Sequence, residues 1–124
     1  NNCLNLLAAF IIFTPLKAVH ALPPDWVSVP QSPYGEQLWD KNSIQKNQDG
    51  SIRVFSKFTP KSTTEIAEDI LYTMDLNCSG KSFRDAGVGV KEFNEFNNKD
   101  LRWKEPNGDQ LISAVIDQVC IFTN

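Results

Sequence analysis

The stretch ILYTMDLNC, residues 70–78, alternates between apolar and polar side chains: every even-numbered residue is apolar or cysteine, and the odd-numbered residues after Leu71 are polar. A period of two is typical of a half-buried antiparallel strand. Near the C-terminus, LISAVIDQVC at residues 111–120 has apolar residues three or four positions apart. This spacing is typical of a helix with one apolar stripe. The sequence therefore predicts a strand and a helix that share one core.

Each of these two elements ends in a cysteine. The alternation along the strand aims Cys78 at the core, and Ile112, Ile116 and Cys120 lie on one side of the helix at intervals of four residues. We therefore expect a Cys78–Cys120 disulfide. The alternative, two reactive thiols, would fit a CxxC motif or a neighbouring histidine, and neither cysteine has one.

The segments before residue 70 predict further strands. Apolar or alternating runs occur at residues 26–29, 37–40, 44–46 and 52–58. The Asp49-Gly50 step between the last two runs predicts a hairpin turn.

After residue 78, the sequence predicts strands at residues 82–86, 88–93 and 101–104, with Gly87 and Gly89 marking a bulge or bend. The helix is expected to run from about Asp109 to Ile121, capped by Asn107 or Asp109. The predicted fold class is α+β: an antiparallel sheet meander followed by a C-terminal helix that packs on one face and is tied to the sheet by the disulfide.

Residues 1–21 precede this predicted domain and have the pattern of a secretory signal. Residues 4–13 form an apolar run too short to span a bilayer, which takes about 20 residues. Val19 and Ala21 suit a signal peptidase, so we expect cleavage after Ala21. The alternative is a helix that belongs to the domain, but Pro23 and Pro24 follow at once and predict a linker.

The expected mature chain is a single domain, residues 22–124. It carries 11 basic and 15 acidic residues, two cysteines and no histidine. This acidic balance does not suit nucleic-acid binding, which needs a basic surface. Without histidine there is no Ser-His-Asp or Cys-His system and no ordinary zinc or copper site. We therefore expect no metal, no cofactor and no membrane span in the mature chain.

Carboxylates are the remaining candidates for catalysis. They form two clusters in the sequence: Glu65, Glu68 and Asp69 in one, and Glu92 and Glu95 in the other. A glycosidase needs two carboxylates across a cleft, and a meander of this size offers little cleft. We interpret both clusters as solvated surface and expect no catalytic residues and no enzyme, with a small hydrolase as the alternative.

The strongest candidate for protein binding is the strand at residues 52–58 and its exit. Arg53, Phe55 and Lys57 share the face opposite Ile52, Val54 and Phe58, and Lys61 follows. If the face of Ile52, Val54 and Phe58 packs on the helix, Phe55 is exposed on the opposite face. It then lies between the cations of Arg53 and Lys57, which suits recognition of a protein. The alternative is a core strand with solvated lysines. An exposed edge strand could also pair with a partner or a second copy.

The order of several motifs resembles one known family. These are Trp26, the hairpin at residues 49–54, the strand at 72–78, Trp103 with Pro106, and the helix ending Gln118-Val119-Cys120. Together they are similar to the surface-adhesin protein E family of small exported bacterial proteins. The most specific are Asp75-x-x-Cys78 and Val119-Cys120.

The resemblance implies a largely antiparallel sheet with a C-terminal helix held by the disulfide. It also implies an exported, adhesin-like protein in the periplasm or on the surface of a bacterium, with host extracellular-matrix or serum proteins as ligands. A periplasmic structural or accessory module with no adhesive role is the alternative.

Overall fold

The computed structural model describes residues 22–62 and 68–124. The predicted signal, residues 1–21, and Glu65 lie outside the described residues. In chain order, the elements are β1 (Trp26–Ser28), β2 (Gly35–Asp40), the 3₁₀ helix η1 (Lys41–Ser43), β3 (Gln45–Lys46), β4 (Ile52–Pro60), β5 (Ile70–Asn77), β6 (Ser82–Val88) and α2 (Gln110–Thr123).

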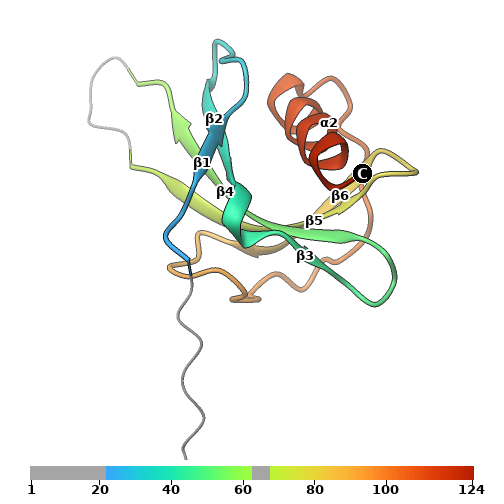
Figure 1. The fold of residues 1–124 in the computed structure, drawn as a ribbon. Helices are drawn as coiled ribbons and strands as arrows, with labels where there is room; N and C mark the ends of the chain where they lie inside the picture. Colours follow the sequence, from blue (N-terminus) through green and yellow to red (C-terminus); the bar gives the residue numbers. More distant parts are fainter. Residues whose placement is uncertain (1–21, 63–67) are drawn as a thin grey trace, which may run out of the picture.

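The strands form one antiparallel sheet in the order β1-β2-β4-β5-β6. Strand β3 pairs with the start of β4, and β2 pairs with the rest of it. The sheet curves strongly, and α2 lies on its concave side (Figure 1). This confirms the predicted α+β class. The expected hairpin at Asp49-Gly50 is also confirmed, because it joins β3 to β4.

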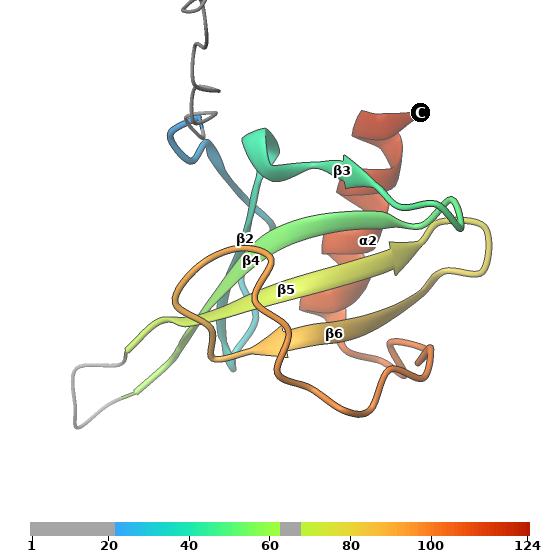
Figure 2. The same cartoon turned by 90° about the horizontal axis from the view of Figure 1, so that it is seen from below.

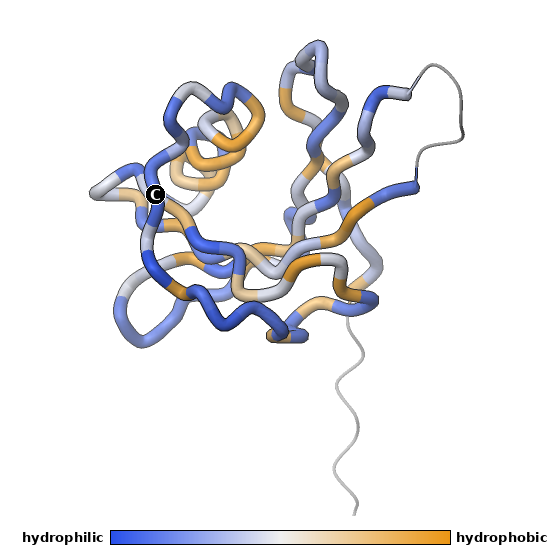
Figure 3. Tube along the Cα trace, turned by 180° about the vertical axis from the view of Figure 1, so that it is seen from behind, coloured by the Kyte–Doolittle hydropathy of each residue, from blue (hydrophilic) through white to orange (hydrophobic). Residues whose placement is uncertain are grey.

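The core lies between α2 and the concave face of the sheet. Val54 and Leu76 point from the sheet toward Val115 and Val119 on the helix, and all four are fully buried. Figure 3 shows hydrophobic residues along the helix and the central strands, in contrast to the largely hydrophilic connecting segments. Of the two expected capping residues, Asp109 caps the helix, since its carboxylate accepts hydrogen bonds from the N–H groups of Leu111 and Ile112.

The convex face of the sheet is covered as well. Figure 2, seen from below, shows the segment between β6 and α2 crossing this face, with the helix on the far side. The N–H of Asn94 in this segment donates to Thr73 Oγ1, at 3.2 Å. Thr73 and Asp75, which the alternation predicts on the solvent side, are therefore fully buried. The sheet is covered by a helix on one face and by irregular chain on the other.

Two predicted strands are wrong. Residues 89–93 form bends because the chain turns away from β6 at Gly89, whose φ is +63°, a left-handed conformation that glycine adopts readily. Residues 101–104 make only an isolated bridge between Lys104 and Phe83. Asn97 and Asn98 also donate to Ala86 O, so this segment lies along the β6 edge without forming a continuous strand.

The predicted irregularity at Gly87 is confirmed. The register between β5 and β6 shifts between Thr73 and Met74, opposite Gly87. A Cβ atom at Gly87 would lie 2.1 Å from Glu95 O, so only glycine allows the covering segment to approach this closely.

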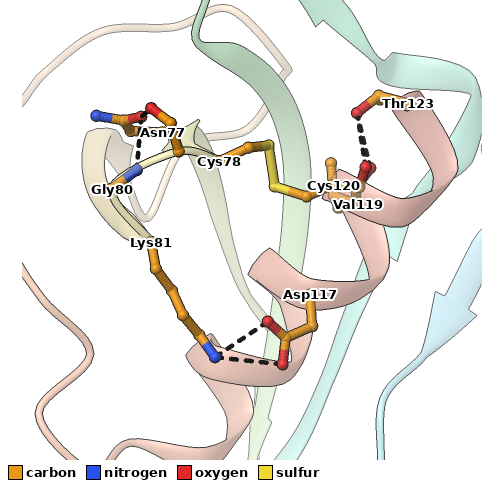
Figure 4. Close-up of a disulfide and its surroundings, with 9 residues drawn as sticks. Asn77, Cys78, Gly80, Lys81, Asp117, Val119, Cys120 and Thr123 are labelled. Atoms are coloured by element: carbon orange, nitrogen blue, oxygen red, sulfur yellow. Dashed lines mark hydrogen bonds and ion pairs between the residues drawn. A yellow bond between two sulfur atoms is a disulfide. The ribbon is translucent and has the colours of Figure 1, made fainter.

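The predicted Cys78–Cys120 disulfide is present and joins the turn after β5 to the last turns of α2 (Figure 4). The expectation that Cys78 points into the core is wrong. Strand β5 ends at Asn77, so Cys78 lies in the turn and is exposed, whereas Cys120 is half-buried. Beside the bond, Lys81 Nζ lies 3.1 Å from Asp117 on the helix. The disulfide therefore lies at the edge of the core, where it connects the sheet to the helix.

Candidate functional site

The structure places Arg53, the first of the predicted binding residues, in an internal ion cluster. Arg53 Nε lies 2.7 Å from Asp75 Oδ1, and its guanidinium lies 4.6 Å from the ring centroid of Phe96. Phe96 belongs to the covering segment, so the guanidinium lies between the sheet and this cover. Its charge and its flat face both have partners within the chain.

Asp75 is the centre of this cluster. Arg84 Nε lies 3.0 Å from Oδ2, and Asn47 Nδ2 donates to Oδ1 at 3.1 Å. Burial alone would raise the pKa of Asp75, but the hydrogen bonds from Arg53, Arg84 and Asn47 outweigh it and hold the pKa below its usual range. Arg84 also lies over the ring of Trp103, at 4.2 Å. The cluster joins three strands, the β3–β4 turn and the covering segment.

Phe55 is half-buried rather than exposed. Its ring lies between those of Trp26 and Phe93, with centroids 5.6 and 5.5 Å away. Lys57 Nζ lies over the ring of Trp26, 4.4 Å from its centroid. The convex face of β4 therefore supplies a packed aromatic layer, which sequence reasoning missed because the rings that cover Phe55 come from distant parts of the chain.

Lys61 is exposed and lies just beyond the end of β4. The structure therefore brings Arg53, Phe55 and Lys57 together on one face but does not place Lys61 with them. The backbone N–H of Lys61 instead donates to Tyr34 O, at 2.9 Å. Lys61 therefore lies beside the turn between β1 and β2.

The carboxylates considered for catalysis that the structure describes, namely Glu68, Asp69, Glu92 and Glu95, lie on the surface. The Glu95 carboxylate accepts hydrogen bonds from the N–H groups of Lys91 and Glu92, which makes it part of a local turn. Glu68 and Asp69 are exposed, and the Asp69 carboxylate accepts from the hydroxyl of Thr59. Within residues 22–62 and 68–124, no group of three His, Cys, Asp or Glu side chains is placed to hold a metal ion.

A groove opens on the concave side, between the N-terminal end of α2 and the sheet, with a volume of about 600 Å³. Its floor consists of Phe58, Tyr72 and Met74, from β4 and β5. One wall is the turn at residues 32–34, and the other is the start of α2 at residues 107–112. The groove forms because α2 packs on β2 near its C-terminal end, where Trp39 Nε1 donates to Gln118.

Tyr34 stands at the rim of this groove with 79% of its surface exposed. Its backbone is nevertheless held on both sides. Its N–H donates to Ser32 Oγ at 3.1 Å, and its carbonyl accepts from Lys61 at 2.9 Å. The bridge between Ser32 and Gly35 closes the turn. The result is an exposed aromatic side chain on an ordered backbone.

Asp85 brings a carboxylate into the groove from β6, opposite Met74. Among the described residues, no group donates a hydrogen bond to this carboxylate and none forms an ion pair with it. Burial raises the pKa of Asp85 to about 6, with Lys104 opposing the rise and Asp109 adding to it. Burial also raises the pKa of Tyr72, and both aspartates contribute.

Asp85→Asn is expected to raise the free energy of unfolding by about 1–2 kcal/mol at about pH 7.5. The folded chain holds the Asp85 proton more tightly than the unfolded chain, since the pKa rises from 3.8 to about 6 on folding. Wild-type stability from this group is therefore greatest below about pH 4 and is lost as the pH rises through about 6. Urea unfolding across this range measures it. Equal stability of variant and wild type at about pH 7.5 would contradict the prediction.

The family model described as surface adhesin-E matches residues 27–124, which include every strand from β2 onward and α2. The chain belongs to the surface adhesin-E family. Neither the curated proteins nor the solved structures give a significant match. Membership implies an adhesin-like role in protein binding and an exported or cell-surface location.

The residues that carry the likeness to the adhesin-E family have structural roles here. Asp75 holds the ion cluster, Cys78 and Cys120 form the disulfide, and Trp103 covers Arg84. Among the described residues of this family member, no helix has the length and apolar character needed to cross a membrane. Because these residues maintain the fold, the groove is the better candidate for the binding site.

Proposed function

We propose that this adhesin-E family member binds host extracellular-matrix or serum proteins, and that the ligand docks in the groove beside α2. The observation that carries the proposal is Tyr34, an exposed aromatic residue on a backbone held at both ends, at the rim of an open groove. Family membership supports protein binding over catalysis.

A surface that is already ordered loses less conformational entropy when a ligand binds. Tyrosine is enriched among the residues that dominate binding energy, because it contributes a large, amphipathic contact area. Because hydrogen bonds already hold the Tyr34 backbone, this turn loses less conformational entropy on binding than a flexible loop would. The convex face offers less, because the chain's own segment already covers it.

Tyr34→Ser is expected to weaken binding to an immobilised matrix protein at least tenfold, a loss typical of an interface anchor. Surface plasmon resonance against vitronectin, laminin and fibronectin measures it. Ile121→Ser is the matched control, because Ile121 is 76% exposed but lies at the other end of α2.

The surface expected from the sequence is tested in the same assay. Lys57→Gln combined with Lys61→Gln removes both lysine charges and leaves the aromatic layer in place. If this variant loses binding while Tyr34→Ser retains it, the ligand docks at the end of β4 and the groove assignment is wrong. If no matrix or serum protein binds saturably, the adhesin proposal is wrong.

Export is part of the proposal. We propose that residues 1–21 are removed after Ala21 and that the mature chain reaches the cell surface. The alternative from the sequence, a periplasmic accessory module, predicts confinement to the periplasm. Fractionation with surface proteolysis distinguishes the two, because protease added to intact cells digests a displayed protein and spares a periplasmic one.

A further inference from the structure

We propose that the groove recognises a peptide segment that carries an arginine or lysine side chain between apolar residues, with Asp85 as the charge partner. This inference rests on the proposed protein-binding function and specifies the chemistry of the ligand. It comes from the composition of the groove, which combines an apolar floor with one carboxylate that accepts no hydrogen bond and forms no ion pair within the described residues.

The charge of the groove favours a cation. The described residues that line it include Asp85 and Asp109, with their carboxylates, and none of them is a lysine, arginine or histidine. Asp109 is already engaged, because its carboxylate caps α2. Asp85 is free to accept hydrogen bonds, and charge-assisted bonds from a guanidinium or ammonium group are among the strongest in proteins.

The remaining surface of the groove favours a peptide over a free cation. Tyr34, Phe58 and Tyr72 offer aromatic rings, and Pro33 and Ile112 add apolar surface. Aromatic faces attract cations and also bury the methylene stem of an arginine or lysine. The apolar neighbours of the basic residue would cover the rest. A small cation without such neighbours would leave this surface in water.

An unpartnered, half-buried carboxylate is also unfavourable for the free protein. Burial raises the pKa of Asp85 to about 6, so the ionised form is disfavoured until a cation arrives. The charged or titratable groups that face it are Tyr72 on β5, Asp109 at the start of α2, and Lys104 after β6. A bound guanidinium would stabilise the ionised form, so affinity should fall about tenfold between about pH 7.5 and about pH 5.

The probe is the N-acetylated, C-amidated peptide Gly-Leu-Arg-Leu-Gly, titrated into ¹⁵N-labelled protein and followed by NMR. The matched peptide replaces arginine with citrulline, which keeps the shape and removes the charge. We expect the arginine peptide to shift the amides of Tyr34, Asp85 and Leu111 and to bind at least tenfold more tightly than the citrulline peptide. Asp85→Asn should abolish this difference, whereas Asp25→Asn, the same change at an exposed residue before β1, should preserve it.

Several outcomes would overturn the inference. These are equal binding of the two peptides, an unchanged preference in Asp85→Asn, and shifts confined to the convex face. Since Asp85→Asn is expected to be more stable than the wild type, loss of binding in this variant would not come from unfolding. If the peptide fails but matrix proteins still bind, only this inference is wrong. If the peptide binds but no matrix protein does, the groove is a basic-peptide site and the adhesin proposal is wrong.

Discussion

Asp75→Asn is expected to lower the free energy of unfolding by about 3–5 kcal/mol, the largest effect of any single substitution considered for this chain. The substitution leaves the guanidinium groups of Arg53 and Arg84 beneath the covering segment without their shared counter-ion. Both side chains are only about one-fifth exposed, so water replaces the lost partner poorly. Guanidinium chloride unfolding measures the change.

Asp117→Asn is the matched control. It makes the same chemical change in the Lys81–Asp117 pair, whose side chains are each more than half exposed. An exposed pair contributes about 0–1 kcal/mol. Equal losses in the two variants would show that the Asp75 cluster gains nothing from burial.

The Asp75 cluster also predicts an acid response. Folding lowers the pKa of Asp75 below 3.8, so its stabilisation is present above about pH 4 and is lost as the pH falls through the folded-state pKa. Asp75→Asn should lack this part of the acid transition. Asp85 acts in the opposite direction, since its contribution becomes more favourable as the pH falls from about 6 to about 4. The two variants separate the two contributions.

Replacing Cys78 and Cys120 together with alanine is expected to lower the free energy of unfolding by about 4 kcal/mol. The cysteines are 42 residues apart, and a loop of that length loses much of its freedom in the unfolded chain when it is closed. Because Cys78 is exposed and Cys120 only half-buried, the substitution leaves little cavity. The loss therefore comes chiefly from the missing cross-link.

Reduction provides the control for the disulfide prediction. A reducing agent should lower the melting temperature of the wild type toward that of the double variant and leave the variant unchanged. Hydrogen exchange should show α2 opening before the sheet, since one apolar stripe and the Trp39–Gln118 bond then hold it. An unchanged wild-type melting temperature on reduction would contradict the stabilising role of the bond.

Local patterns in the sequence predict the concave side well. The strand β5, the stripe on α2, the Asp109 cap and the Asp49-Gly50 turn depend on patterns of neighbouring residues, and each is found in the structure. The cysteine pairing was predicted correctly even though the expected orientation of Cys78 was wrong. Two elements that share a core and end near each other can place their cysteines together at its rim.

The convex side could not be predicted in the same way. Whether Phe55 and Asp75 face water depends on the path of a hydrophilic segment that contributes isolated apolar residues, among them Phe93, Phe96 and Trp103. One hint was present: an aspartate at the centre of a strand with arginines on both neighbouring strands indicates a shared ion cluster. The groove gave no comparable signal, because it depends on where α2 begins relative to the turn at residues 32–34.

The path of residues 97–104 along β6 has a consequence for how these molecules behave at high concentration. Phe83 exchanges backbone hydrogen bonds with Lys104, and the carbonyl of Ala86 accepts from the N–H groups of Asn97 and Asn98. The N–H and carbonyl of Val88 both bond to the side-chain amide of Asn97. An open strand edge is a template for aggregation between copies. The opposite edge, β1, has only three residues and lies between Pro24 and Pro30, which cannot donate backbone hydrogen bonds. Densely packed copies would therefore resist joining their sheets into fibres.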